Sequence, residues 1–130
     1  MKIDASVKIC YLNGKPIMVD QVPERDAIGK VLMVGGQPQL TGGVPLTVGL
    51  VIANVLTLQK HEKFSYLRSL AVAQTFYKSS PQTDVNEGDV ADLIEIVQDD
   101  KTAGIYTPLV IGQVVKILQD AKEKVGKAKK

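Results

Sequence analysis

The sequence of 130 residues has no tryptophan, one cysteine, one histidine and only 5% aromatic residues. The single cysteine, Cys10, excludes an intrachain disulfide, and we expect it to be a small apolar residue of a strand rather than a reactive thiol. Because aromatics are scarce, the core must consist mainly of Val, Leu, Ile and Ala. The net charge of +2 is too small to indicate a polyanionic partner by itself.

The sequence also lacks a targeting segment and a long apolar run. Asp4 places an acid where a signal peptide would begin its apolar region. The longest nearly apolar run, residues 44–58, would span about 22 Å as a helix, against roughly 30 Å of hydrocarbon in a bilayer. We therefore expect a cytoplasmic protein with no membrane partner, organised as a single domain over residues 1–130.

Signatures of catalysis, cofactor binding and metal binding are missing as well. The glycine-rich stretch 35–43 lacks the Gly-Lys-Ser/Thr of a phosphate-binding loop, so it predicts a turn. The acidic stretch 84–95 has the spacing of a calcium-binding loop, but Asp89 stands where the sharp turn of that loop needs glycine, and a helix cap at Asn86 explains the same residues. We expect His61, in a polar helix start, at the surface. The sequence thus predicts a protein that is not an enzyme, with no catalytic residue, cofactor or metal.

Residues 1–45 have the pattern of strands and turns. Apolar residues alternate with polar ones up to Tyr11, where Asn13-Gly14 gives a strong hairpin signal. The turn sequence of residues 12–16 partly recurs at residues 34–38. Either two similar hairpins or one meander of about four strands would produce this pattern.

Residues 46–125 predict about four helices. The first covers residues 48–58, with Thr47 as its cap, and is apolar on nearly every side, so it is either buried centrally or part of an oligomer interface. A second helix is expected at 61–79, a third after Asn86, and a fourth from Thr107-Pro108.

The second helix has two groups of apolar residues. We expect Phe64, Leu67 and Ala71 on one stripe of this helix, and Tyr66, Leu70 and Tyr77 beside that stripe. The whole chain is then an α+β domain, with an N-terminal β-hairpin or meander packed on a C-terminal bundle of about four helices, and residues 126–130 fray.

The charges divide sharply near the end of the sequence. Residues 84–100 contain seven acids and no Lys or Arg, whereas residues 116–130 contain six lysines and two acids. Opposite fields on neighbouring segments indicate contact surfaces, within one molecule or between copies. The residues expected in such charge-mediated contacts are Asp92, Glu95, Asp99, Lys122, Lys124 and Lys127.

Together, the apolar first helix and the opposed charges predict a non-enzymatic protein that self-associates or binds a partner protein. The residues expected in the apolar interface are Val48, Val51, Ile52, Val55, Val110 and Val114. The alternative is a nucleic-acid-associated regulator that uses the lysine-rich C-terminal helix. That helix has neither Arg nor aromatic residues, so any contact would be weak, directed to phosphates and lost with added salt.

Three segments resemble small uncharacterised proteins of tailed bacteriophages and prophages: the turn Asn13-Gly14-Lys15-Pro16-Ile17, the stretch 45–56 and the stretch 106–113. Residues 20–44 and the lysine-rich end look like insertions relative to that pattern. The resemblance implies a phage accessory or assembly component, in the cytoplasm of the host cell or in the virion, with a phage or host protein as partner. It implies no activity, and no functional residue transfers from it.

Overall fold

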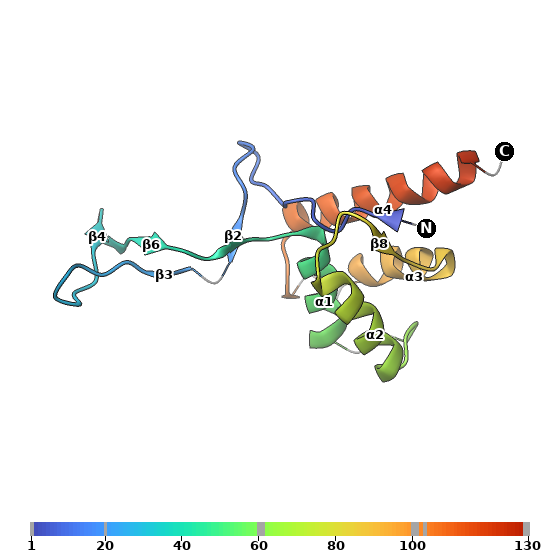
Figure 1. Cartoon of the computed structure of the whole chain (residues 1–130), viewed down its shortest axis with the longest axis horizontal. Coiled ribbons are helices and arrows are strands. Elements are labelled where there is room, and N and C mark those ends of the chain that lie inside the picture. The colour runs from blue at the N-terminus through green and yellow to red at the C-terminus, as the bar shows by residue number, and fades with distance from the viewer. Residues whose placement is uncertain (1, 20, 60–61, 100–101, 103, 129–130) are drawn as a thin grey trace.

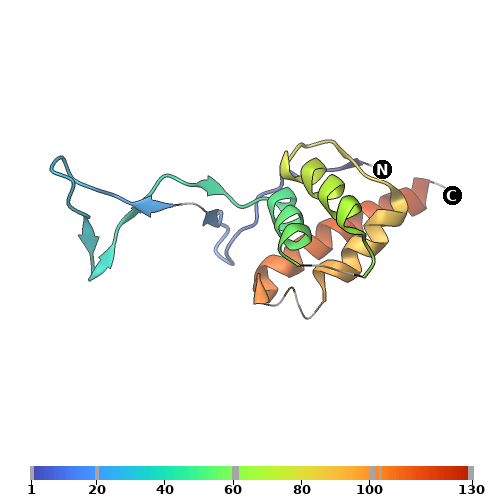
Figure 2. The ribbon, with the colours of Figure 1, turned by 90° about the horizontal axis from the view of Figure 1, so that it is seen from below.

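The computed structural model describes residues 2–19, 21–59, 62–99, 102 and 104–128, the last four by their backbone alone. The chain forms a helical body and an arm of paired strands that extends from one end of the body (Figures 1 and 2). Here the body comprises residues 2–8 and 46–128, the base hairpin residues 9–17, and the arm residues 18–45. The predicted α+β class, with β hairpins ahead of four helices, is confirmed.

The first helix, α1 (Val48–Leu58), lies at the centre of the body. Thr47 caps it as predicted, because its side chain accepts a hydrogen bond from the backbone N–H of Leu50 at 3.2 Å. The other helices pack around α1, and the N-terminal segment contacts its first turn, where the Gly49 N–H donates to the carbonyl of Ala5 at 3.0 Å. This enclosure explains why α1 is apolar on nearly every side.

The remaining helices are α2 (Tyr66–Tyr77), α3 (Glu87–Val97) and α4 (Pro108–Ala128). Ser65 caps α2, so this helix starts later than the sequence predicts, and His61 lies outside the described residues. Asn86 caps α3 as expected, by accepting from the Gly88 N–H at 2.9 Å. Helix α4 continues to Ala128, beyond the predicted end of the helical segment at residue 125, and the expected fraying of residues 126–128 stays a prediction. Residues 129–130 lie outside the described part of the chain.

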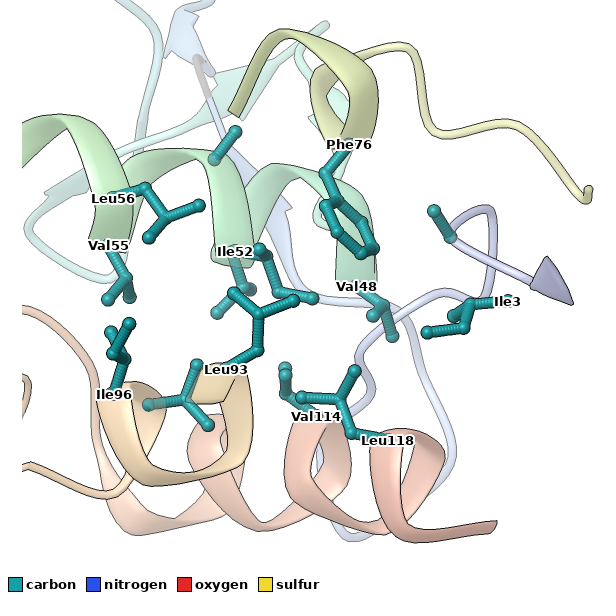
Figure 3. Close-up of a cluster of buried hydrophobic side chains, with 14 of the residues drawn as sticks. Ile3, Val48, Ile52, Val55, Leu56, Phe76, Leu93, Ile96, Val114 and Leu118 are labelled. Atoms are coloured by element: carbon teal, nitrogen blue, oxygen red, sulfur yellow. The ribbon is translucent and has the colours of Figure 1, made fainter. Parts of the chain in front are cut away.

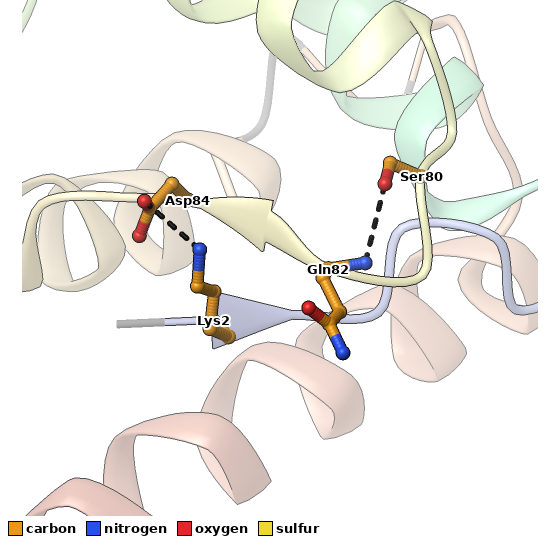
Figure 4. A network of polar contacts seen from close by, with 4 residues as sticks. All are labelled: Lys2, Ser80, Gln82 and Asp84. Carbon is orange, nitrogen blue, oxygen red and sulfur yellow. Dashed lines mark hydrogen bonds and ion pairs between the residues drawn. The ribbon is translucent and has the colours of Figure 1, made fainter.

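The N-terminal segment closes one side of the body. Strand β1 (Lys2–Ile3) pairs antiparallel with β8 (Thr83–Asp84), and Lys2 lies opposite Asp84. The Lys2 ammonium lies 3.0 Å from a carboxylate oxygen of Asp84. Figure 4 shows this ion pair. In the same connection, the Gln82 N–H donates to the Ser80 hydroxyl at 3.2 Å, and the Ser80 carbonyl accepts from Ala5. The connection between α2 and α3 is therefore tied to the start of the chain.

The hydrophobic core consists of aliphatic side chains and two phenylalanines from every layer of the body. Figure 3 shows its central part, where α1 lies between α2 and the pair α3 and α4. The residues labelled there are Ile3, Val48, Ile52, Val55, Leu56, Phe76, Leu93, Ile96, Val114 and Leu118. Among the described residues, the fully buried apolar side chains include none between Ile9 and Leu46, so the base hairpin beyond Ile9 and the arm add no fully buried side chain to the core.

The arm contains three short antiparallel strand pairs, which follow one another outward from the body (Figure 1). They are β2 (Met18–Val19) with β7 (Val44–Pro45), β3 (Val22–Pro23) with β6 (Leu40–Thr41), and β4 (Met33–Val34) with β5 (Gln37–Pro38). Among the strands, β1 contacts α4 and β8 contacts α2, and Gln113 of α4 bonds to the backbone of Cys10. The segment 20–44, which departs from the phage resemblance, forms most of the arm.

Candidate functional site

The residues expected in an apolar interface lie instead in the core of the single chain, which corrects that prediction. All six are buried by other parts of the same molecule: Val48, Val51, Ile52, Val55, Val110 and Val114. The physical reason is that α1 is covered along most of its length, with Thr57 and Leu58 exposed at its end, and that α4 turns its apolar stripe toward α1 and α3. Of the two interpretations left open for residues 48–58, the structure selects the buried central helix.

The charged residues singled out from the sequence lie on two neighbouring helices of one molecule. Asp92, Glu95 and Asp99 belong to α3 and its C-terminal end, Lys122 and Lys124 belong to α4, and α3 packs directly against α4. The segments of opposite charge are thus brought together within the body. The side chain of Lys127 lies outside the described residues.

The ion pair of Glu95 involves another element, because its carboxylate lies 3.0 Å from the Lys63 ammonium in the connection between α1 and α2. The hydrogen bond and the charge of Glu95 raise the pKa of Lys63 above its usual value. Both side chains are largely exposed, so water and salt weaken the pair. We therefore assign this pair no part in a binding site.

The arm presents apolar side chains to solvent, and the sequence analysis did not identify them. Six large apolar residues of the arm are exposed: Val22, Ile28, Met33, Val34, Leu40 and Val44. At its far end, the Asp26 carboxylate accepts hydrogen bonds from the N–H groups of Ile28 and Lys30, each at 3.0 Å, and Arg25 donates to the Gly29 carbonyl at 2.7 Å. These contacts fix the turn and leave Ile28 87% exposed.

Two rings of backbone hydrogen bonds hold the shape of the β structure. At the root, Ile9 donates to Leu46 at 2.8 Å, Leu46 donates to Ile17 at 2.8 Å, and Ile17 donates back to Ile9 at 2.9 Å. Each of the three residues gives one hydrogen bond and receives one, so three chain segments meet in a closed junction. The base hairpin, residues 9–17, projects from this point.

The same ring recurs in the arm. Glu24 donates to Gln39 at 2.7 Å, Gln39 to Leu32 at 2.8 Å, and Leu32 back to Glu24 at 2.8 Å. The two recurring turn sequences, residues 12–16 and 34–38, lie on hairpins that close at these junctions. The backbone groups in both rings are satisfied within the β structure, so its exposed side chains, rather than these groups, are free for a further contact.

A second exposed apolar surface lies on α2. Phe64, the first residue of the predicted stripe, is buried, but the rest of that stripe is not. Leu67 is 81% exposed and Ala71 is exposed too, whereas Ser69, Ala73 and Phe76 face inward. Small residues face α1 because the two helices lie very close together, and Gly49 permits this approach to the carbonyl of Phe76. The larger apolar residues of α2 are thereby left facing solvent.

Between α1 and α2 this surface is hollowed into an open groove of two adjoining depressions, the larger of about 560 Å³. We call it the α1–α2 groove. Its exposed apolar rim consists of Leu58, Tyr66, Leu70 and Tyr77. Thr57 and Leu70 line both depressions, and Lys78 stands at one end beside Tyr77. The signal for this groove in the sequence is the set of large apolar residues beside the predicted stripe of the second helix.

The polar contacts near this groove bind elements of the body together. Arg68 forms an ion pair with Asp89 and lies over the ring of Phe64, 4.4 Å from its centre, so it joins α2 to α3. The amide of Asn54 donates to the hydroxyl of Tyr106 at 2.7 Å and links α1 to the start of α4.

Groups suited to metal ligation are not gathered in the part of the chain that the structure describes: no three His, Cys, Asp or Glu side chains converge there. Over the same residues, no helix has both the length and the apolar character needed to cross a bilayer. Cys10 is half-buried, and its thiol lies 3.6 Å from the carbonyl of Lys8.

Comparison with models of protein families, with curated proteins and with solved structures gives no match. The resemblance to phage proteins therefore stays a prediction. The structure does give roles to residues within the resembling segments: Asn54 and Tyr106 bond to each other, and Gln113 bonds to the backbone of Cys10.

Proposed function

We propose that this chain is a non-enzymatic protein that acts by binding protein surfaces, in the first place those of other copies of itself. The observation that carries the proposal is the arm, which places six large apolar side chains in solvent on a backbone fixed by its own hydrogen bonds. Apolar surface that is ordered in advance loses little conformational freedom when a partner covers it.

The exposed area of the chain supports the same proposal. The chain exposes 8253 Å² for a mass of 14.1 kDa. A compact monomer of that mass exposes roughly 6,700 Å². The surplus of about 1,500 Å² is close to twice the roughly 800 Å² that one partner buries in a standard protein–protein interface.

A bacteriophage accessory or assembly component is the setting that the resembling segments suggest for this role. The alternative, a nucleic-acid-associated regulator, has less support. The exposed lysines Lys122 and Lys124 flank Glu123, and α4 lies against the acidic helix α3. Both features weaken the positive field that would attract phosphates.

The solution mass tests the proposal. Light scattering after size exclusion, from about 1 to 100 μM protein and at low and moderate salt, should show a defined oligomer. Its mass should persist in salt because apolar contacts are not screened. A monomer over the whole range would contradict self-association and leave only a different protein as partner. An oligomer that dissociates with salt would mean that charges, and not the apolar surfaces, hold the copies together.

A further inference from the structure

The chain carries two exposed apolar surfaces, the arm and the α1–α2 groove. The arm runs away from its own body, whereas the groove lies on α1 and α2 (Figures 1 and 2). The arm of a given chain therefore does not cover that chain's own groove. Each copy has one arm and one groove, so every arm can be paired with the groove of another copy.

We infer that the arm of one copy docks into the α1–α2 groove of a second copy. This inference rests on the self-association proposed above and specifies its two surfaces. The side chains that enter the contact are Ile28 and Val34 near the end of the arm, and Leu70 and Tyr77 line the receiving groove.

The surface area agrees with this arrangement. Each chain takes part twice, once through its arm and once through its groove. A standard interface covers about 800 Å² on each partner, so two roles cover about 1,600 Å² per chain. That figure matches the surplus of about 1,500 Å² over a compact monomer of this mass.

The chemistry of the two surfaces also agrees. Both are dominated by large apolar side chains, and their removal from water drives association. The backbone of the arm is already hydrogen-bonded in its strand pairs and in the ring of Glu24, Leu32 and Gln39, so docking needs no new strand pairing. The contact is therefore one of side chains in a groove, and its geometry is set by the fixed turns of the arm.

Two single substitutions separate the two surfaces. Ile28→Glu places a charge on the arm, and Leu70→Glu places one in the groove; both side chains are at least half exposed in the single chain. Each variant should keep the far-UV circular dichroism of the wild type and weaken self-association by at least about tenfold, as expected for a charge placed in an apolar contact. Leu12→Glu, at a residue 94% exposed on the base hairpin and outside both surfaces, is the matched control and should retain the wild-type mass.

Mixing the two variants gives the decisive measurement. The Leu70→Glu chain keeps an intact arm, and the Ile28→Glu chain keeps an intact groove. An equimolar mixture should therefore form a complex of one copy of each at concentrations where each variant alone is monomeric. If Leu70→Glu alters the fold, Tyr77→Glu, at the other end of the groove, replaces it.

Other outcomes overturn the inference. If both variants keep the wild-type mass, self-association is real but uses other surfaces. If both become monomeric and the mixture stays monomeric, the arm does not bind the groove. If the wild-type protein is a monomer, both this inference and the proposed self-association are wrong. If nuclease dissociates a wild-type oligomer, nucleic acid and not the arm joins the copies.

Discussion

The side-chain amide of Gln113 forms a two-way hydrogen bond with the backbone of Cys10. Its Oε1 accepts from the Cys10 N–H at 2.9 Å, and its Nε2 donates to the Cys10 carbonyl at 2.8 Å. One side chain of α4 thus takes the place of a neighbouring strand. Because Cys10 starts the base hairpin, this contact fastens the root of the β structure to the helical body.

Replacing Gln113 by Met keeps the size of the side chain and removes both hydrogen bonds. The backbone groups of Cys10 then lose partners in a half-buried place, so the free energy of unfolding should fall by about 1–3 kcal/mol. Urea denaturation followed by circular dichroism measures this change. Gln119→Met, at an exposed position of the same helix, is the control and should shift stability by less than about 0.5 kcal/mol. Equal midpoints for the two variants would contradict this role for Gln113.

Adding one methyl group at Gly49 and at Gly112 should have opposite effects on the stability of the protein. At Gly49 the new Cβ would collide with the carbonyl oxygen of Phe76 and lie 2.9 Å from the Ser79 hydroxyl, so Gly49→Ala should destabilise the protein by about 1–3 kcal/mol. At Gly112 nothing lies within 4 Å. Gly112→Ala should raise stability by about 0.5–1 kcal/mol through helix propensity. Thermal unfolding of both variants checks the signs; a stabilised Gly49→Ala would mean that α1 and α2 are not in close contact.

The body should fold without most of the arm. Val19 and Val44 are paired across β2 and β7, so residues 20–43 can be replaced by an Asn-Gly turn. Because the buried apolar residues lie outside the excised segment, the shortened chain should keep its helical circular dichroism. It should unfold cooperatively, and its free energy of unfolding should differ from that of the full chain by less than about 1 kcal/mol. Loss of cooperative unfolding would show instead that the arm supports the body.

The Lys2–Asp84 pair should make stability depend weakly on acid pH. The hydrogen bond and charge of Lys2 lower the pKa of Asp84 in the folded chain. The contribution is therefore present above the ordinary pKa of an aspartate and is lost as the pH falls through the lowered folded value. In Lys2→Gln, titration of the Asp84 carboxyl by NMR should show its pKa moved upward, toward the ordinary value. Lys8→Gln, on another exposed lysine of the same segment, should leave it unchanged, and equal titration of wild type and Lys2→Gln would contradict the pairing.

The helices of the body were largely predictable from local signals. The cap at Thr47, the cap at Asn86 and the start of α4 at Pro108 follow from residue types beside apolar runs, and the structure has all three. These signals act over a few residues, so they do not depend on tertiary contacts. The end of α4 was missed because glycine and lysines at its C-terminus were interpreted as a frayed tail.

Local signals could not predict which side of α2 faces the core. An apolar pattern favours Leu67 as an inward residue, but the closeness of two helices depends on small residues such as Ser69, Ala73 and Gly49. Hydrophobicity alone gives such residues little weight. The arm was missed for a related reason, since Val22 and Leu40 are typical strand residues whether or not another layer covers them.

The ring of hydrogen bonds at Ile9, Ile17 and Leu46 has a consequence for how the chain folds. Residues 10–45 separate Ile9 from Leu46, and bringing the ends of so long a flexible loop together costs about 3 kcal/mol of chain entropy. Short hairpins within that loop form from neighbouring residues, and each one brings the ends nearer. Ile3, Ala5 and Ile9, which complete the core, then arrive beside α1 through a series of local closures instead of one long search.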